Sequence, residues 1–144
     1  MRRQVLSVMA VSVLSFMISG CASKQVSLVE KNQVTIEKQG SEKVRILSTD
    51  VYQQDGQVWA YGLLEQKGLG VGAVKTHVDI RVVAPDGLVS YETISDDVYV
   101  PGYRVGKGIH WKRFKSQLPE KLLEGSQVTM TVHSGEHQPK EDKS

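Results

Sequence analysis

The segment from residue 103 to residue 115 combines cationic and aromatic side chains and contains no acidic residue. Cations beside flat rings can bind a polyanion or an acidic protein surface through charge and stacking. Lysines on an edge strand also discourage pairing with other chains, and this is the alternative explanation for the charges. The candidate partner-binding residues are Tyr103, Arg104, Lys107, Trp111, Lys112, Arg113 and Lys115.

Three further polar residues have types that bind metals. His77 and Asp79 lie two positions apart on the outward face of one predicted strand, and His133 lies on the outward face of the last. If these two strands were neighbours, the three side chains could share one metal ion. The chain lacks a closely spaced His or Cys pair of the usual zinc type, so we expect solvated histidines and no cofactor. Metal binding stays open as an alternative function.

The glycine-rich stretch 68–76 ends in Lys75-Thr76 and superficially follows a phosphate-binding loop. Such a loop has glycine before the lysine, where this chain has Val74. It must also open a helix whose first amides face the anion, whereas this stretch leads into a predicted strand. We expect an ordinary connection between strands.

The sequence contains no arrangement of residues that is typical of an active site. No serine lies in a Gly-x-Ser-x-Gly motif. The pair Asp96-Asp97 lies in a predicted turn, which favours solvated or capping carboxylates over an acid/base pair. We therefore expect that the protein is not an enzyme.

The chain has one cysteine, Cys21, and its position indicates how the protein is held in the cell. Arg2 and Arg3 precede a short apolar run, 5–17, and small residues follow, which is the plan of a secretory signal. The tetrapeptide Ile18-Ser19-Gly20-Cys21 resembles the lipobox of bacterial lipoproteins. This resemblance implies cleavage after residue 20 and attachment of lipid, including palmitate, to Cys21.

The residues after Cys21 bear on the destination. Ala22 and Ser23 stand where an aspartate would retain a Gram-negative lipoprotein in the inner membrane, so the resemblance implies the outer membrane, facing the periplasm. The 13-residue apolar run is shorter than the roughly 20 residues that span a bilayer. A retained transmembrane anchor and plain secretion remain the alternatives.

The mature chain has no net formal charge. Removing Arg2 and Arg3 from the chain's 18 basic residues leaves 16, equal to its 16 acidic residues. A neutral domain lacks the basic field that a nucleic-acid partner requires. With one cysteine the mature chain forms no internal disulfide, so packing alone must hold its core.

Period-2 alternation of apolar residues recurs along the chain, and no helical periodicity follows the signal. In the clearest strand, 75–83, Val78, Ile80 and Val82 face one way. In 57–64 both faces are apolar, which predicts a central strand or a covered aromatic face. Turn signals such as Asp55-Gly56 separate the strands every eight to twelve residues. This spacing predicts an all-β fold, a single antiparallel sandwich of about seven strands.

The spacing of Phe114, Leu118 and Pro119, followed by Gly125 and Val128, is similar to the late strands of immunoglobulin-like domains of bacterial envelope proteins. The predicted organisation is a signal peptide at 1–20, a lipidated cysteine and polar tether at 21–40, a β-sandwich at 41–135 and a disordered tail at 136–144. We expect a non-catalytic binding or envelope-assembly role, with an envelope protein or an anionic envelope glycan as partner. A structural envelope spacer is a further alternative.

Overall fold

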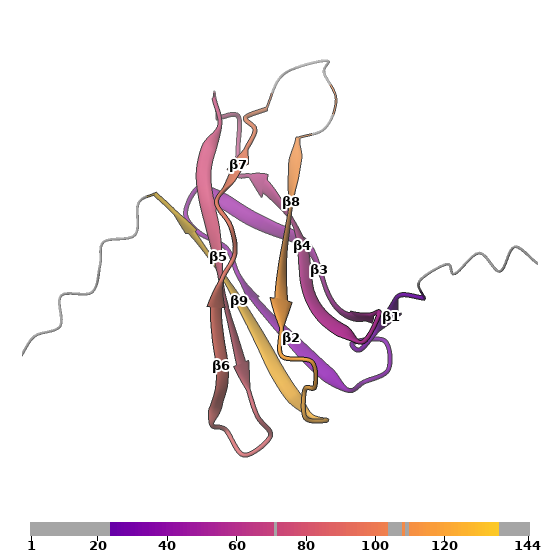
Figure 1. Ribbon diagram of the computed structural model, residues 1–144. Helices are drawn as coiled ribbons and strands as arrows, with labels where there is room; N and C mark the ends of the chain where they lie inside the picture. Colours follow the sequence, from indigo (N-terminus) through magenta and orange to yellow (C-terminus); the bar gives the residue numbers. More distant parts are fainter. Residues whose placement is uncertain (1–23, 71, 104–107, 109, 136–144) are drawn as a thin grey trace, which may run out of the picture.

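The computed structural model describes residues 24–70, 72–103, 108 and 110–135, and these residues form two β-sheets packed face to face (Figure 1). The predicted all-β sandwich is confirmed. The nine strands of the described residues are β1 (Val26–Ser27), β2 (Val34–Gln39), β3 (Val44–Gln54), β4 (Gln57–Gln66), β5 (Val74–Val83), β6 (Val89–Ile94), β7 (Val98–Val100), β8 (Trp111–Leu118) and β9 (Ser126–Ser134).

The first sheet, called sheet A here, has the strand order β1-β3-β4-β8 and is antiparallel throughout. The hairpin β3–β4 turns at Asp55 and Gly56, both of which have positive φ (52° and 78°). A type I′ turn requires this conformation, and it is the reason that Asp-Gly ends the strand here. The strand predicted to be central, β4, lies inside the sheet between β3 and β8.

The second sheet, sheet B, has the order β2-β9-β5-β6, and β7 pairs with the same strand, β5, as β6 does. All its pairs are antiparallel except β2 with β9, which run parallel from Val34↔Ser126 to Gln39↔Thr131. Thus the first long strand and the last strand of the domain are neighbours, and this parallel pair departs from the predicted antiparallel sandwich.

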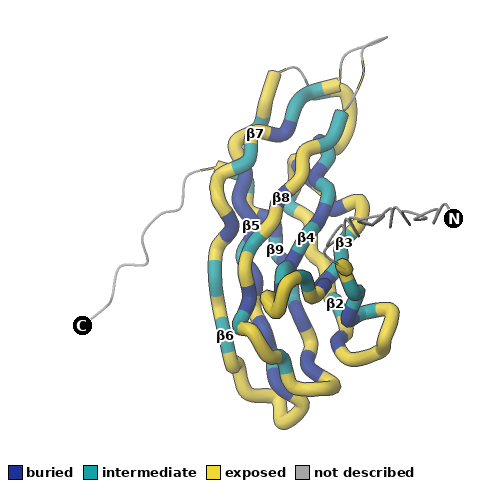
Figure 2. Tube along the Cα trace, turned by 45° about the vertical axis from the view of Figure 1, so that its right-hand side comes forward, coloured by how far each residue is buried: buried dark blue, intermediate teal, exposed yellow. Residues whose placement is uncertain are grey.

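The core lies between the two sheets (Figure 2). Strand β4 shows the alternation most clearly, since every second residue is buried from Val58 to Gln66. Burial of apolar side chains at this density is the main stabilising contribution in a domain without disulfides. The fully buried large side chains from both sheets include Leu64, Ile80, Met130, Val44, Val51, Val58, Val78, Val82, Val100 and Val128.

The folded domain begins earlier in the chain than residue 41. Strand β1 pairs with β3, Leu28 is 7% exposed, and β2 occupies part of the stretch expected to be a tether. Polar side chains dominate this stretch, yet backbone pairing with β3 and β9 and the burial of Leu28 and Val34 hold it in place. Among the described residues, the first strand therefore starts at Val26.

Several predictions concern residues outside the described ranges. The signal segment, Cys21 with its lipid, the neighbouring Ala22 and Ser23, Arg104, Lys107 and the tail 136–144 all belong to this group. Among the described residues there is no helix that is long and apolar enough to cross a membrane. The described residues of the glycine-rich stretch follow β4, lead into β5 at Val74 as expected, and open no helix.

Candidate functional site

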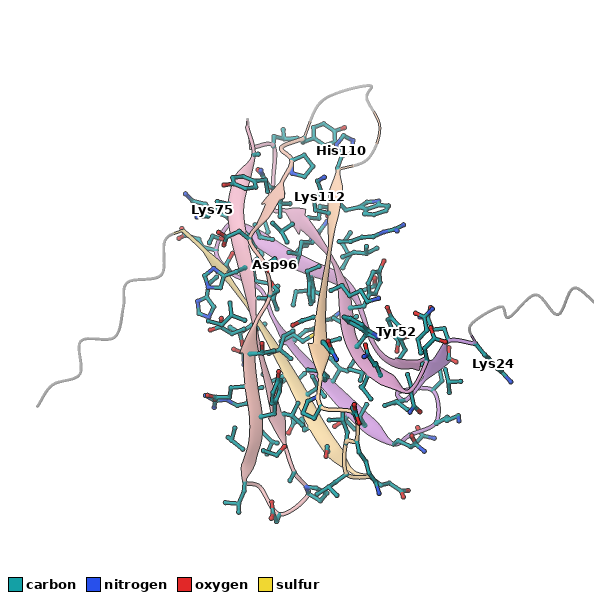
Figure 3. All side chains as sticks on the ribbon, in the orientation of Figure 1. Lys24, Tyr52, Lys75, Asp96, His110 and Lys112 are labelled. Atoms are coloured by element: carbon teal, nitrogen blue, oxygen red, sulfur yellow. The ribbon has the colours of Figure 1, made fainter. Side chains whose placement is uncertain are left out.

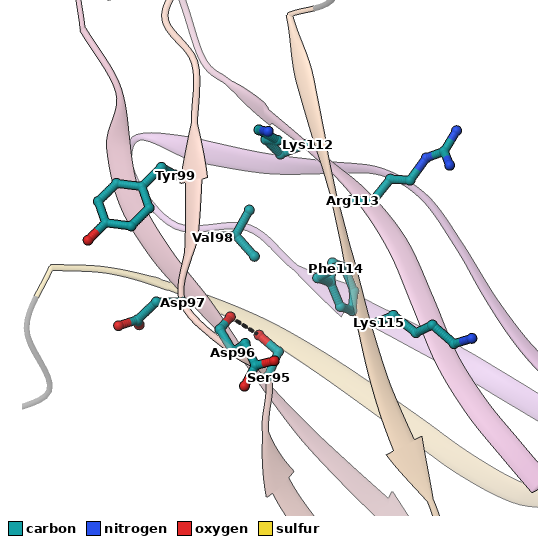
Figure 4. Close-up of a pocket in the computed structure, with 9 residues that line it drawn as sticks. All are labelled: Ser95, Asp96, Asp97, Val98, Tyr99, Lys112, Arg113, Phe114 and Lys115. Atoms are coloured by element: carbon teal, nitrogen blue, oxygen red, sulfur yellow. Dashed lines mark hydrogen bonds between the residues drawn. The ribbon is translucent and has the colours of Figure 1, made fainter.

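Strand β8 contains most of the described cationic and aromatic residues of the candidate segment and divides them between its two sides. Phe114 faces the core and is 2% exposed. Arg113 and Lys115 project from the outer side of sheet A, away from sheet B, while Lys112 points the other way (Figure 4). This division follows from the alternation of side chains along a strand.

The register of sheet A places aromatic residues from β3 and β4 beside these cations. Tyr52 pairs with Trp59, Tyr61 pairs with Lys115, and Glu65 pairs with Trp111. By alternation these side chains share the outer face of sheet A with Arg113. We call this surface the aromatic–cationic face, and it comprises Trp59, Tyr61, Trp111, Arg113 and Lys115, together with Tyr52, which is only 5% exposed.

Cation–π contacts fix the cations over the rings. The Nζ atom of Lys115 lies 4.0 Å from the ring centroid of Trp59 and 5.6 Å from that of Tyr52. The Cζ atom of Arg113 lies 5.3 Å from the ring centroid of Trp111. Each of these contacts is attractive because the ring face carries partial negative charge. The two charges are therefore held at defined positions on the surface.

The acidic residues of the same face are engaged elsewhere. Asp50 accepts a hydrogen bond of 2.7 Å from the Oγ atom of Ser27, and Glu65 accepts one of 2.8 Å from the Nε atom of Arg45. Within the described part of the chain, neither Arg113 nor Lys115 forms a salt bridge with an acidic side chain. The face therefore presents two cationic groups whose charge is available to an external anion.

The other candidate residues lie apart from this face. Lys112 points toward a cleft of about 460 Å³ between β8 and the β6–β7 edge of sheet B, which Arg113 and Lys115 also help to line (Figure 4). The opposite wall of this cleft carries Asp96 and Asp97, so the cleft has mixed charge. His110 lies near the top of the molecule in the view of Figure 3, and the ring centroid of Tyr103 lies 4.8 Å from that of His110. The structure thus brings together Trp111, Arg113 and Lys115 but not the whole candidate segment.

The three candidate metal ligands are neighbours. Strands β5 and β9 pair with His77 directly opposite His133, and the two imidazole rings stack with centroids 5.4 Å apart. The Asp79 carboxylate lies between them, with its oxygens 3.6 Å from Nε2 of His77 and 3.0 Å from Nε2 of His133. His133 is exposed, whereas His77 is only 5% exposed, so the expectation of solvated histidines is wrong for His77, which is covered by its neighbours in sheet B.

This cluster is an arrangement of stacked rings sharing one carboxylate. Over the described ranges, no group of three or more His, Cys, Asp or Glu side chains is arranged to hold a metal ion. The three side chains are therefore adjacent, as a metal site requires, but they are not arranged as metal ligands. The His77–Asp79–His133 cluster connects the middle of β5 to the end of β9.

Comparisons with known proteins add no relative. No protein-family model, no curated protein and no solved structure matches this chain.

Three residues of the face were absent from the sequence-based candidates: Tyr52, Trp59 and Tyr61. The available signal was the aromatic side of the strand 57–64, which predicted a central strand or a covered aromatic face. What the sequence lacked was the pairing of this strand with 111–118, because strand order is decided by long-range packing.

Proposed function

We propose that the protein is an outer-membrane lipoprotein, held through lipid on Cys21 and facing the periplasm, whose domain binds an anionic component of the envelope without catalysis. The observation that supports binding most directly is the pair of cations held over tryptophan rings, Lys115 on Trp59 and Arg113 on Trp111. Tryptophan, tyrosine and arginine are the residue types that dominate binding surfaces.

Because the lipid anchor holds the protein in the envelope, a small binding face is sufficient. Several acyl chains on one cysteine hold a protein stably at a bilayer, since each buried methylene contributes about 0.8 kcal/mol. Two-dimensional confinement then raises the effective concentration of any ligand in the envelope, so a weak surface contact suffices. An acidic envelope protein and an anionic envelope glycan both have the required charge.

Charge reversal tests this binding role. Cells produce the full-length protein either unchanged or with Arg113→Glu and Lys115→Glu, and envelope components are crosslinked in intact cells and quantified. We expect the reversed variant to lose the crosslinked anionic component. A matched variant with Arg81→Glu and Lys121→Glu changes the net charge equally but lies outside the aromatic–cationic face. Equal recovery with all three proteins would reject the face as a binding surface.

A further inference from the structure

The distance between the lipid attachment and the folded domain is short. Strand β1 starts at Val26 and pairs with Gln53 and Tyr52 of β3. Only the four residues 22–25 separate it from Cys21. Even a fully extended chain rises only about 3.3–3.6 Å per residue, so this link spans less than about 20 Å. A lipid on Cys21 therefore keeps the domain at the surface of its membrane.

The link reaches the domain beside the aromatic–cationic face. Ser27 of β1 lies opposite Tyr52 in the register of sheet A, and Tyr52 belongs to that face. Lys24, the first described residue, lies beyond sheet A on the side away from sheet B (Figure 3). Of the two outer sheet surfaces, that of sheet A is therefore the one nearer to the anchor.

The chemistry of this face matches the surface of a bilayer. Tryptophan and tyrosine concentrate at membrane–water interfaces because their rings are apolar and their N–H or O–H groups are polar. Lysine and arginine beside them are attracted to anionic headgroups. Of the nearby carboxylates, that of Glu65 is paired with Arg45 and that of Asp50 accepts a hydrogen bond from Ser27, and among the described residues neither forms a salt bridge with Arg113 or Lys115.

We infer that the aromatic–cationic face lies against the phospholipid headgroups of the membrane that holds the Cys21 lipid. This inference rests on the proposed function, because it needs the anchor, and it names the anionic component as the bilayer itself. The outer surface of sheet B, which carries Arg81, Glu92 and Thr129 around a hollow of about 1250 Å³, then faces away from the membrane.

Fluorescence quenching tests the inference, because the chain's two tryptophans, Trp59 and Trp111, both belong to this face. Full-length lipoprotein extracted from membranes is reconstituted into vesicles of phosphatidylethanolamine and phosphatidylglycerol that carry brominated acyl chains. We expect quenching of both tryptophans, assigned with Trp59→Phe and Trp111→Phe. The double variant Arg113→Gln/Lys115→Gln should lose most of this quenching while the protein stays bound to the vesicles. Arg81→Gln with Lys121→Gln is the control and should change nothing.

The outcomes separate the two proposals. Vesicle-bound protein with unquenched tryptophans overturns the inference and leaves the anchor intact. Unquenched tryptophans whose emission instead shifts on adding purified peptidoglycan or lipopolysaccharide assign the face to a glycan, which overturns the inference and supports the binding role. Protein that does not associate with vesicles at all contradicts the anchor and the inference together. Unfolding curves of each variant exclude loss of the fold as the cause.

Discussion

The ammonium group of Lys115 lies 4.0 Å from the ring centroid of Trp59, across the pairing of β8 with β4. The contact joins two strands that are about fifty residues apart in sequence and holds a cation at a fixed point of sheet A. Such a contact contributes to stability and also makes a spectroscopic marker for the aromatic–cationic face.

Removing this cation should alter both stability and fluorescence. Lys115→Ala is expected to lower the free energy of unfolding by about 0.5–1 kcal/mol, as for an exposed cation–π pair. In a Trp111→Phe background the emission of Trp59 should also shift, because the ring loses its charged neighbour. Arg113→Ala is the matched control, since Arg113 contacts Trp111. An unchanged Trp59 spectrum in Lys115→Ala would contradict the contact.

The pair Gly62 and Phe114 predicts a second, stronger effect. The two residues lie directly opposite each other, and a Cβ atom on Gly62 would come within 2.7 Å of Cζ of Phe114 and 2.9 Å of the Ser48 carbonyl oxygen. Gly62→Ala should therefore lower the free energy of unfolding by about 1–3 kcal/mol through overpacking. Chemical denaturation measures this directly.

The double variant identifies the cause. Phe114→Ala alone should cost about 3–5 kcal/mol, the usual range for truncating a buried phenylalanine. If the ring is what crowds Gly62, the cost of Gly62→Ala falls once the ring is gone. Strictly additive costs would show that the Ser48 carbonyl, and not Phe114, makes glycine necessary.

Ser95 should stabilise the connection between β6 and β7. Its Oγ atom accepts a 2.9 Å hydrogen bond from the Val78 amide and donates one of 3.0 Å to the Asp96 carbonyl oxygen, and the residue is 7% exposed. Ser95→Ala leaves the buried amide without this acceptor, at a cost of about 1–3 kcal/mol. Hydrogen exchange at the Val78 amide should also be faster in Ser95→Ala than in the parent protein.

The neighbouring Ser90 provides the comparison. It is exposed, and its hydroxyl donates a 3.2 Å hydrogen bond to the Val82 carbonyl oxygen. Because water can replace that contact, Ser90→Ala should change stability little. If the two variants are equally stable, the Val78 amide has found another acceptor.

The His77–Asp79–His133 cluster predicts the result of a metal titration. Calorimetry of the protein with zinc and with copper should give no saturable heat, because both imidazoles already approach the one carboxylate and their rings stack. His133→Ala serves as the reference. Saturable binding that His133→Ala abolishes would instead establish the cluster as a metal site.

The sequence predicted the strands well because their signals are local. Alternation in 75–83 and the turn at Asp55-Gly56 depend on neighbouring residues, and β5 and the β3–β4 hairpin occur where expected. Strand β1 escaped prediction because two residues are too few for a period, and its order comes from pairing with β3. The rest of the early part of the domain, β2, escaped because polar side chains dominate it and its pairing with β9 is long-range.

The candidate face was predictable only in part. The cations and Trp111 share one strand, so their proximity can be read from the chain. Trp59 and Tyr61 reach them through the β4–β8 pairing, which no local pattern specifies. Alternation along β8 explains why Lys112 separates from Arg113 and Lys115, because a strand divides consecutive residues between its two faces.

The state of Cys21 is the central question, and a single labelling measurement addresses it. Cells grow with a palmitate analogue, and the protein is recovered and its mass determined. We predict a labelled mature chain that begins at Cys21, and an unlabelled Cys21→Ser variant that is neither processed nor held in the membrane. An unlabelled parent protein, or normal processing and membrane retention of Cys21→Ser, would contradict the account.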